Sequence, residues 1–424
     1  MQQQLTPSDG RYPTGPCRST AHLIGKGRPY FVAADTVGLR AAHGRSTAGR
    51  TFVPGADPID SRSEIIDFVR CSYLGLDNHP VIVAGAIAAI EAKRSTHRSC
   101  ARTLLDLDLL RELEDTLSNM FCARVLAFSS GVLANMGAMR ILALGQLTGG
   151  RRPVVVFDRL AHISLAYHKP VVADETRVET IAHNDIGALE RLCRENPVVA
   201  YVCDGVYSVG GHSPIKELRQ LQERYGLFLY IDDAHGLSVV GCQGEGFARS
   251  QFPKVLGDRI IIAASLANGF GASGGMLMLG SSDHEAIFRQ YSVDYAPVAP
   301  NLAAIGAALG SCKIHRSPEL SQRQARLAQR IDLFDRRVVT AEQGNSLSIR
   351  MIAIGSEANA TAVARGLLDA GFYTSVTFVP TAAQGRAGIR VCITAEHEAR
   401  DIERLCDCIL EQVAETTGKP YPLR

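Results

Sequence analysis

Residues 198–236 read VVAYVCDGVYSVGGHSPIKELRQLQERYGLFLYIDDAHG. This stretch begins with a continuous apolar run, passes through an amphipathic segment at 215–226 and ends with a second apolar run at 227–233. Strands of a parallel sheet read as continuous apolar runs because helices cover both faces, and the helix between two such strands provides the crossover. The stretch therefore predicts a βαβ unit.

The same alternation continues on both sides of this unit. The further segments are RVLAF (124–128) with GVLANMGAMRILAL (131–144), PVVVFD (153–158) with HISLAY (162–167), RIIIAAS (259–265) and GGMLMLG (274–280). Repeated βαβ units indicate an α/β fold around a large, mainly parallel sheet that is buried on both faces. In such a sheet a ligand binds outside the carboxyl ends of the strands, so functional residues are expected there.

The length of 424 residues predicts more than one folded unit. Residues 1–60 are rich in Gly, Pro, Ser and Thr, which is typical of an extended N-terminal arm. Residues 61–300 contain the βαβ pattern and form the predicted large domain. Residues 301–424 combine long helical patterns with the strand-like runs SLSIRMIAI, YTSVTFV and GIRVCIT, which predicts a smaller C-terminal α+β domain.

Composition is that of an ordinary globular enzyme, with 46% hydrophobic residues, 21% charged residues and a formal net charge of +2. This balance indicates neither a nucleic-acid surface nor a membrane surface. The sequence has no apolar leader and no apolar run of about 18 residues, so we expect a cytoplasmic protein. The eleven cysteines include no CxxC pair, which favours reduced thiols over a disulfide framework or a metal site.

Polar residues gather where the predicted strands end. They are Asp158, His162 and Ser164 after one strand, Asp204, Tyr207 and Ser208 after another, and Asp232, Asp233 and His235 after a third. One such Asp or His is more often a cap or a packing residue than a catalyst. Three neighbouring strand ends that all carry polar groups indicate a shared ligand crevice. Ser130 and Gly131, at the start of a predicted helix, suit a phosphate.

These segments together resemble the α-oxoamine synthases, which depend on pyridoxal 5'-phosphate. The resemblance rests on SYLGLDNHP, FSSGVLAN, DRLAHIS, DGVYSVGG, IDDAHGLSVVG, SLANGFGASGG and RVCITAEH, in the family's order between about residues 70 and 400. It implies the fold-type-I transferase fold, with a large, mainly parallel sheet of the seven-stranded type and a smaller C-terminal α+β domain. It also implies a homodimer with shared active sites, and the decarboxylative condensation of an amino acid with an acyl thioester carried by coenzyme A or an acyl carrier protein.

The resemblance assigns a role to particular residues. It implies that Asp232 pairs with the pyridine nitrogen, that His162 stacks on the ring, and that Ser208 and His235 contact the phenolic oxygen. The phosphate ligands it implies are the backbone at Ser130, Gly131 and Val132, the hydroxyl of Ser265, and Ser292 of the neighbouring subunit. Arg390 corresponds to the arginine that clamps the amino-acid carboxylate, and Ser72 stands where we place the family's asparagine before YLGL. No residue is expected to bind a metal.

One position departs from the family in a way that bears on catalysis. Asn268 stands where the family has the lysine that forms the Schiff base with the cofactor and moves the proton at the substrate's α-carbon. Three explanations stay open: an engineered replacement, a naturally degenerate subunit that supports an active paralogue, and an enzyme that holds the cofactor without a covalent bond. Because Asp232, His162, His235 and Ser265 are retained, we favour a site built for catalysis.

A second departure concerns the substrates. The family's glycine-rich segment is replaced by STHRSCARTLLDLDLLRELE at 95–114. In the family, this segment and the asparagine before YLGL lie where the amino acid and the acyl donor meet. The identities of the amino acid, the acyl chain and its carrier therefore stay open.

Overall fold

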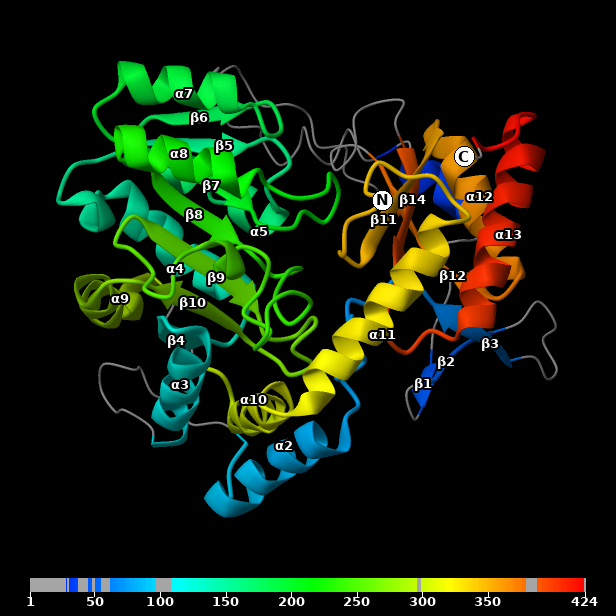
Figure 1. Cartoon of the computed structure of the whole chain (residues 1–424), viewed down its shortest axis with the longest axis horizontal. Coiled ribbons are helices and arrows are strands. Elements are labelled where there is room, and N and C mark those ends of the chain that lie inside the picture. Colours follow the sequence, from blue (N-terminus) through cyan, green and yellow to red (C-terminus); the bar gives the residue numbers. More distant parts are fainter. Residues whose placement is uncertain are drawn as a thin grey trace, which may run out of the picture.

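The computed structural model describes residues 28, 30–36, 45–47, 50–54, 62–96, 108–295, 299–378 and 387–422. A seven-stranded sheet forms the centre of the larger part, on the left of Figure 1. Its strands, in spatial order, are β4 (Arg124–Phe128), β10 (Gly275–Leu279), β9 (Ile260–Ser265), β8 (Phe228–Asp232), β7 (Val199–Asp204), β5 (Val154–Asp158) and β6 (Val178–Ile181). All neighbours are parallel except that β10 runs antiparallel to both β4 and β9. The prediction of a large, mainly parallel sheet is confirmed.

The direction of β10 follows from the length of the loop before it. A parallel connection needs a crossover of about a dozen residues or more. The loop at 266–274, between β9 and β10, is too short for that crossover, so the chain turns back beside β9. The loop containing Asn268 is therefore a tight return at the carboxyl end of β9.

Helices cover both faces of this sheet, and successive residues of each strand alternate between them. In β8, Phe228 and Tyr230 belong to the core under one helix layer, whereas Leu229 and Ile231 belong to the core under the other. The first layer contains α4 (Gly131–Ala143), α5 (Ile163–Ala166), α6 (Lys169–Ala173) and α9 (Ser282–Tyr295). The second contains α3 (Asp108–Phe121), α7 (Ile186–Glu195), α8 (Ile215–Tyr225) and α10 (Leu302–His315). Burial on both faces explains why the strands are continuous apolar runs.

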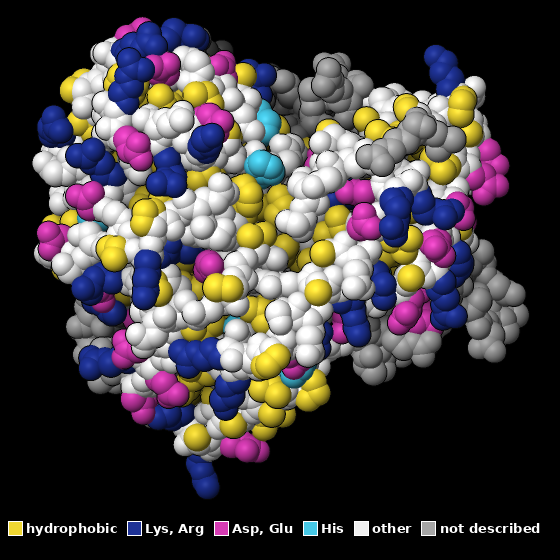
Figure 2. Space-filling view, viewed as in Figure 1, with side chains coloured by type: hydrophobic (Ala, Val, Ile, Leu, Met, Phe, Trp, Pro, Cys, Tyr) yellow, Lys and Arg dark blue, Asp and Glu magenta, His cyan; other side chains and the backbone are white. Residues whose placement is uncertain are grey.

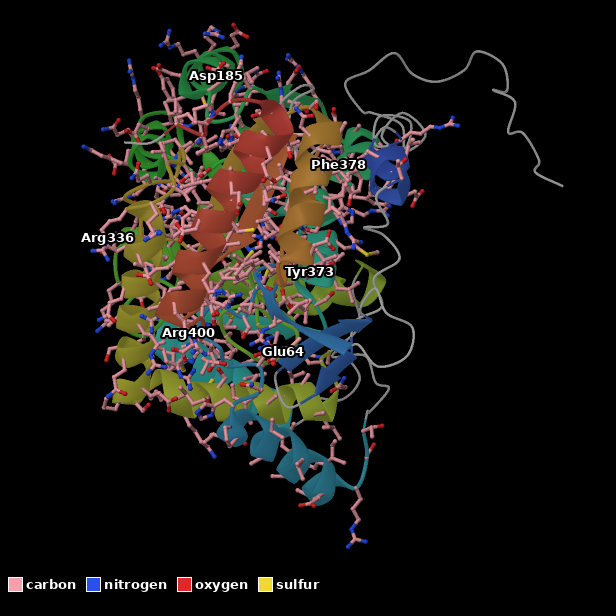
Figure 3. The ribbon with its side chains drawn as sticks, turned by 90° about the vertical axis from the view of Figure 1, so that its right-hand side faces the viewer. Glu64, Asp185, Arg336, Tyr373, Phe378 and Arg400 are labelled. Carbon is pink, nitrogen blue, oxygen red and sulfur yellow. The ribbon has the colours of Figure 1, made fainter. Side chains whose placement is uncertain are left out.

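The smaller part, on the right of Figure 1, contains two further sheets. One sheet contains β11 (Ile349–Gly355), β14 (Ala387–Cys392) and β13 (Ser375–Thr377), and the other contains β1 (Arg45–Thr47), β2 (Arg50–Pro54), β3 (Arg62–Asp67) and β12 (Phe372–Tyr373). The associated helices are α11 (Pro318–Asp335), α12 (Glu357–Asp369) and α13 (Ala399–Thr417). Figure 3 looks onto α12 and α13, with β1 to β3 below them. The expected C-terminal α+β architecture is confirmed.

The N-terminal strands join this smaller part. β3 pairs in parallel with β12, and β2 pairs antiparallel with β3. The division proposed at residue 61 therefore crosses a sheet, and residues 45–54, predicted as part of an extended arm, contribute two of its strands. Residues 30–36 are helical, while most of the proposed arm and residues 97–107 of the segment that departs from the family lie outside the described residues.

Two further contacts fix helices in place. α11 runs diagonally between the two parts in Figure 1, and within the smaller part its Asp335 pairs in a bidentate manner with the fully buried Arg350 of β11, at 2.6 and 2.9 Å. α2 (Pro80–Lys93) packs closely on α10, because a Cβ at Gly85 would lie 2.4 Å from the carbonyl oxygen of Gly306. Among the helices of the described ranges, none combines the length and the apolar character needed to cross a bilayer.

Candidate active site

The N-terminus of α4 faces the end of β9 and forms a candidate anion site. Ser130 is the N-cap of α4, and its hydroxyl accepts a hydrogen bond from the amide of Leu133 at 3.2 Å. A Cβ at Gly131 would lie 4.0 Å from the Cβ of Ser265, the last residue of β9. A Cβ at Gly275 would lie 2.3 Å from the amide nitrogen of Gly131, so glycine is required there for this approach. Free amides at a helix N-terminus beside a hydroxyl favour a phosphate.

Asp232, at the carboxyl end of β8, is a buried carboxylate without a basic partner. Its Oδ2 accepts a hydrogen bond from Asn135 Nδ2 at 2.7 Å, and its Oδ1 accepts one from the amide of Ala234 at 3.0 Å. Burial raises the pKa of Asp232, although these hydrogen bonds and the charge of His162 oppose the shift. No Lys or Arg side chain of the described residues forms an ion pair with it. The carboxylate would therefore be stabilised by a cationic ligand.

A polar network connects Asp232 to His162. Asn135 also donates to Ser164 Oγ at 3.0 Å, and Ser164 Oγ lies 2.7 Å from His162 Nδ1. The backbone amide of His162 donates to Asp204 Oδ1 at 3.1 Å, which fixes the start of α5 against the end of β7. The ring of His162 is thereby held beside the end of β8.

Asn268 and His235 lie on the same side of this crevice. The side-chain nitrogen of Asn268, Nδ2, donates to the backbone carbonyl of Ala234 at 3.0 Å and lies 3.5 Å from His235 Nδ1. The hydroxyl of Tyr73 lies 2.7 Å from the same Nδ1. Burial, followed by the positive charges of Arg390 and His162, lowers the pKa of His235 to about 3. His235 is therefore a neutral imidazole at physiological pH.

Arg390, on β14, extends from the smaller part toward these strand ends. Its Nε donates to the backbone carbonyl of Ser208 at 2.9 Å, and its Nη2 lies 4.0 Å from the Sγ of Cys71. Burial opposes its charge, but the neighbouring Cys392, Tyr73 and Cys71 raise the pKa of Arg390 above its ordinary value. No Asp or Glu of the described residues forms an ion pair with it. A bidentate cation in this setting suits a ligand carboxylate.

Three further residues expected in the site are Ser72, Val132 and Ser292. The hydroxyl of Ser72 donates to Asp77 Oδ1 at 2.8 Å, and it is the preceding residue, Cys71, that faces Arg390. The chain turns here, since the amide of Tyr73 donates to the carbonyl of Cys71 at 2.9 Å and that of Gly75 to the carbonyl of Ser72 at 2.9 Å, and the two side chains have different partners. Val132 is 53% exposed on the first turn of α4, so only its backbone can contribute. Ser292 lies in α9, and its side chain lies outside the part of the structure that is described.

Three residues that the sequence did not single out belong to the network. Asn135 joins Asp232 to Ser164, Tyr73 bonds His235, and Cys71 contacts Arg390. Asn135 is detectable in principle, because it is a polar residue in the otherwise apolar run GVLANMGAM of a buried helix. Tyr73 and Cys71 carry no such signal, since their role depends on contacts with distant parts of the chain.

Comparison with known proteins gives this site its class. The family model of aminotransferase class I and II matches residues 63–409, so the chain belongs to that family, whose cofactor is pyridoxal 5'-phosphate. Its relatives place the chain among the α-oxoamine synthases of that family. It is 30% identical over 360 residues to 8-amino-7-oxononanoate synthase from Geobacter sulfurreducens, covering 82% of this chain and 89% of the relative. It is 28% identical over 358 residues to the enzyme of that name from Marinomonas sp., covering 81% and 84%.

Solved structures agree on the fold. Serine palmitoyltransferase from Sphingomonas wittichii superposes with a TM-score of 0.79 at 18% identity, covering 94% of this chain and all of that one. The 8-amino-7-oxononanoate synthase from Francisella tularensis gives a TM-score of 0.69 at 19% identity, covering 83% and 99%. The chain thus has the fold-type-I transferase fold that the sequence motifs predicted, and the predicted family is confirmed.

The residues present fit pyridoxal 5'-phosphate. A phosphate suits the free amides of α4 beside Ser265, and a protonated pyridine nitrogen would supply the cation that the buried Asp232 lacks. The two features lie at the carboxyl ends of neighbouring strands, where the fold is expected to bind its ligand.

Proposed function

We propose that this chain binds pyridoxal 5'-phosphate without a covalent bond, in a site built for the condensation of an amino acid with an acyl thioester. The observation that carries the proposal is Asp232, a buried carboxylate whose hydrogen-bond donors among the described residues are Asn135 and the backbone amide of Ala234. A carboxylate in this position costs stability unless a cation approaches it, and the protonated cofactor ring is such a cation. When bound, the cofactor supplies an electron sink for the α-carbon of the amino acid.

The surrounding side chains support distinct tasks. The α4 N-terminus with Ser265 would hold the phosphate, His162 would cover one face of the ring, and neutral His235 would donate or accept at the phenolic oxygen. Arg390, held by the Ser208 carbonyl, would orient the carboxylate of the amino acid. These side chains bind the cofactor and orient the amino acid, and neither task requires a lysine.

Asn268 limits what the chain can do with its ligands. An amide has neither the basicity nor the nucleophilicity of an amine, and the loss of a general base typically costs about 10²–10⁴-fold in rate. Lys169 donates to Thr180 at 3.1 Å and Lys93 pairs with Asp108 at 2.6 Å, and neither partner belongs to the candidate site. We therefore expect tight ligand binding with little or no turnover by the chain alone.

A second candidate function is that of a non-catalytic subunit that stabilises an active paralogue. Asn268 favours it, and so do two exposed apolar surfaces suited to subunit contact. One is on α2, with Val81, Val83 and Ile87 between 40% and 50% exposed, at the lower end of the molecule in Figure 2. The other joins α4 and α5 through Val132, Met136, Ile163 and Tyr167. The same surfaces support a homodimer.

Titration with pyridoxal 5'-phosphate, followed by visible absorbance, tests the proposal. We expect saturable binding, the release of free cofactor on denaturation, and no pyridoxyl group on the chain after borohydride reduction. Asp232→Asn should weaken the binding, and Asp233→Asn serves as the matched control because Asp233 faces the opposite helix layer. A reduced pyridoxyl group mapped to any single lysine would contradict non-covalent binding, and the absence of binding would contradict the proposal as a whole.

A further inference from the structure

Two thiols and a guanidinium meet at the edge of the candidate site. Arg390 and Cys392 are two residues apart on β14, so their side chains lie on the same face of the strand. Arg390 Nη2 lies 4.0 Å from the Sγ of Cys71. The amide of Cys392 donates to the carbonyl of Phe68 at 2.7 Å, which holds β14 against the segment leading to Cys71. Cys392 is fully buried, whereas Cys71 is partly exposed.

This cluster has a cation without a carboxylate. Arg390 is only 9% exposed, and its guanidinium donates to the Ser208 carbonyl and contacts the Cys71 sulfur. A buried guanidinium is costly unless an anion neutralises it. Among the described residues, the side chains beside it that can become anionic are Cys71, Tyr73 and Cys392, whereas His235, which also senses its charge, can only be neutral or cationic. One of these three groups is the available counterion.

The surroundings select Cys71 as that counterion. A hydrogen bond from Cys392 lowers the pKa of Cys71, burial opposes this, and the charge of Arg390 lowers it further, to about 5. The pKa of Cys392 is raised by its hydrogen bond with Cys71, by burial and by nearby charges that include Asp67 of β3. Burial raises the pKa of Tyr73 as well. The Sγ of Cys71 lies 3.9 Å from the carbonyl oxygen of Val69 and 4.0 Å from Arg390 Nη2, so loss of its proton gives up the first contact and strengthens the second. Of the two thiols in this cluster, Cys71 is the one that solvent reaches.

We propose that Cys71 is a nucleophilic thiolate paired with Arg390, and that it is a covalent modification site for small uncharged electrophiles, hydroperoxides in particular. The thiolate attacks one oxygen of the hydroperoxide, an S–O bond forms, the O–O bond breaks, and hydroxide or alkoxide leaves. Sulfur loses two electrons and the peroxide gains them. The resulting sulfenic acid can condense with the neighbouring thiol of Cys392, which forms a disulfide and releases water.

The modification would control access to Arg390. In the ligand-free chain the thiolate neutralises the guanidinium, and an incoming carboxylate would take its place. Because the carboxylate subsite rests on the proposed function, this consequence depends on that proposal, whereas the reactivity of Cys71 depends only on its contacts with Arg390 and Cys392. The two can therefore fail independently.

The pH dependence of alkylation tests the reactivity directly. The full-length chain is treated with iodoacetamide between pH 6 and 8, and the Cys71 peptide is quantified by mass spectrometry beside that of the exposed Cys242. An ordinary thiol with a pKa near 8.5 loses roughly 80-fold in rate over this range, because only the thiolate reacts. We expect the Cys71 rate to change by less than about threefold. The dependence of the rate on pH is the diagnostic quantity. The absolute rate is not, because a thiolate of low pKa is also a weaker nucleophile.

Variants and a second reagent make the test decisive. Arg390→Gln should make the Cys71 rate fall by about tenfold or more between pH 8 and 6, since the counterion is lost. Hydrogen peroxide followed by dimedone should label Cys71 or yield a Cys71–Cys392 disulfide, with Cys242 unlabelled at the same dose. A Cys71 slope equal to that of Cys242 in the unmodified chain would overturn the proposal, even if Arg390→Gln fails to fold. Protection of Cys71 by an amino acid would separately support the carboxylate subsite, and its absence would count against that subsite alone.

Discussion

Replacement of His183 should cost stability in a pH-dependent way, because this histidine holds the loop that positions Arg390. His183 Nδ1 lies 3.0 Å from Asp158 Oδ1, and its Nε2 lies 2.9 Å from the carbonyl oxygen of Gly210. Both acceptors are satisfied at once only when both ring nitrogens carry protons. The loop at 205–213 carries Ser208, whose carbonyl accepts from Arg390. The charged imidazole is thus part of the support of the carboxylate subsite.

The sign of the effect follows from the pKa of His183. Burial opposes the charge, but the hydrogen bond to Asp158 and the charge of that carboxylate raise the pKa of His183 above its usual value. The stabilisation is therefore complete below the unfolded-state pKa of about 6.5 and is lost as pH rises through the folded-state value. A charge-assisted hydrogen bond contributes about 1.5–3 kcal/mol and a neutral one about 0.5–1.5 kcal/mol. His183→Phe should therefore lower the free energy of unfolding by about 2–4 kcal/mol at about pH 5.5 and by about 0.5–1.5 kcal/mol at about pH 9.

Urea denaturation followed by far-UV circular dichroism at the two pH values measures this difference. Phenylalanine keeps the edge-to-face packing on Tyr207, whose ring centroid lies 4.5 Å away, so lost packing contributes little. Tyr201→Phe is the matched control, since it removes another hydrogen bond to Asp158, of 2.8 Å, from a group that stays neutral. Its cost should be equal at both pH values. A cost of His183→Phe that does not change with pH would refute the assignment of a charged imidazole.

Other changes test the site and the packing. Asp232→Asn should weaken pyridoxal 5'-phosphate binding by about 10- to 100-fold, the equivalent of a charge-assisted hydrogen bond, and Asp233→Asn by less than about threefold; equal losses in an absorbance titration would mean that the wrong carboxylate is assigned. Asp335→Ala should lower the free energy of unfolding by about 3–5 kcal/mol in urea, because it leaves a buried guanidinium unpaired, and a loss under about 1 kcal/mol would contradict this. Gly85→Ala should lower the free energy of unfolding by about 1–3 kcal/mol, because the added methyl group separates α2 from α10. Gly257→Ala is the control and should change it little, since its added Cβ meets nothing within 4 Å. Equal losses in the two variants would contradict the close approach of the two helices.

The sequence predicts the central sheet well, because a strand that is buried on both faces appears in the sequence as a continuous apolar run. The strands at 199–204, 228–232 and 260–265 each lie within a predicted apolar run. The edge strand β6 was missed, and its short sequence VETI includes two positions that are only partly buried, so no continuous apolar run marks it. The pairing of β3 with β12 was missed as well, because it joins segments about 300 residues apart and no local pattern encodes such a pairing.

The candidate site was predictable where motifs carry it. Asp232 and Ser265 end the neighbouring strands β8 and β9, and His162 follows the end of β5 at the start of α5, as their positions after apolar runs indicate. The contacts of Ser72 with Asp77 and of Cys71 with Arg390 show the limit, because they lie in a turn whose side-chain directions no local sequence pattern encodes. The chemical roles of the site residues remain predictions for the experiments above.

Restoration of the amine in Asn268→Lys tests the central claim most directly. Asn268 lies beside His235 and Ala234 at the inner end of the β9–β10 loop, so a lysine there should reach the cofactor's aldehyde. We predict that the variant, loaded with pyridoxal 5'-phosphate and reduced with borohydride, carries one pyridoxyl group on residue 268, and that it exchanges the α-hydrogen of at least one common amino acid with heavy water by NMR. The unmodified chain should do neither. A variant that binds the cofactor yet carries no pyridoxyl group at residue 268 would contradict the assignment of the site, and a labelled variant without exchange would favour the non-catalytic subunit.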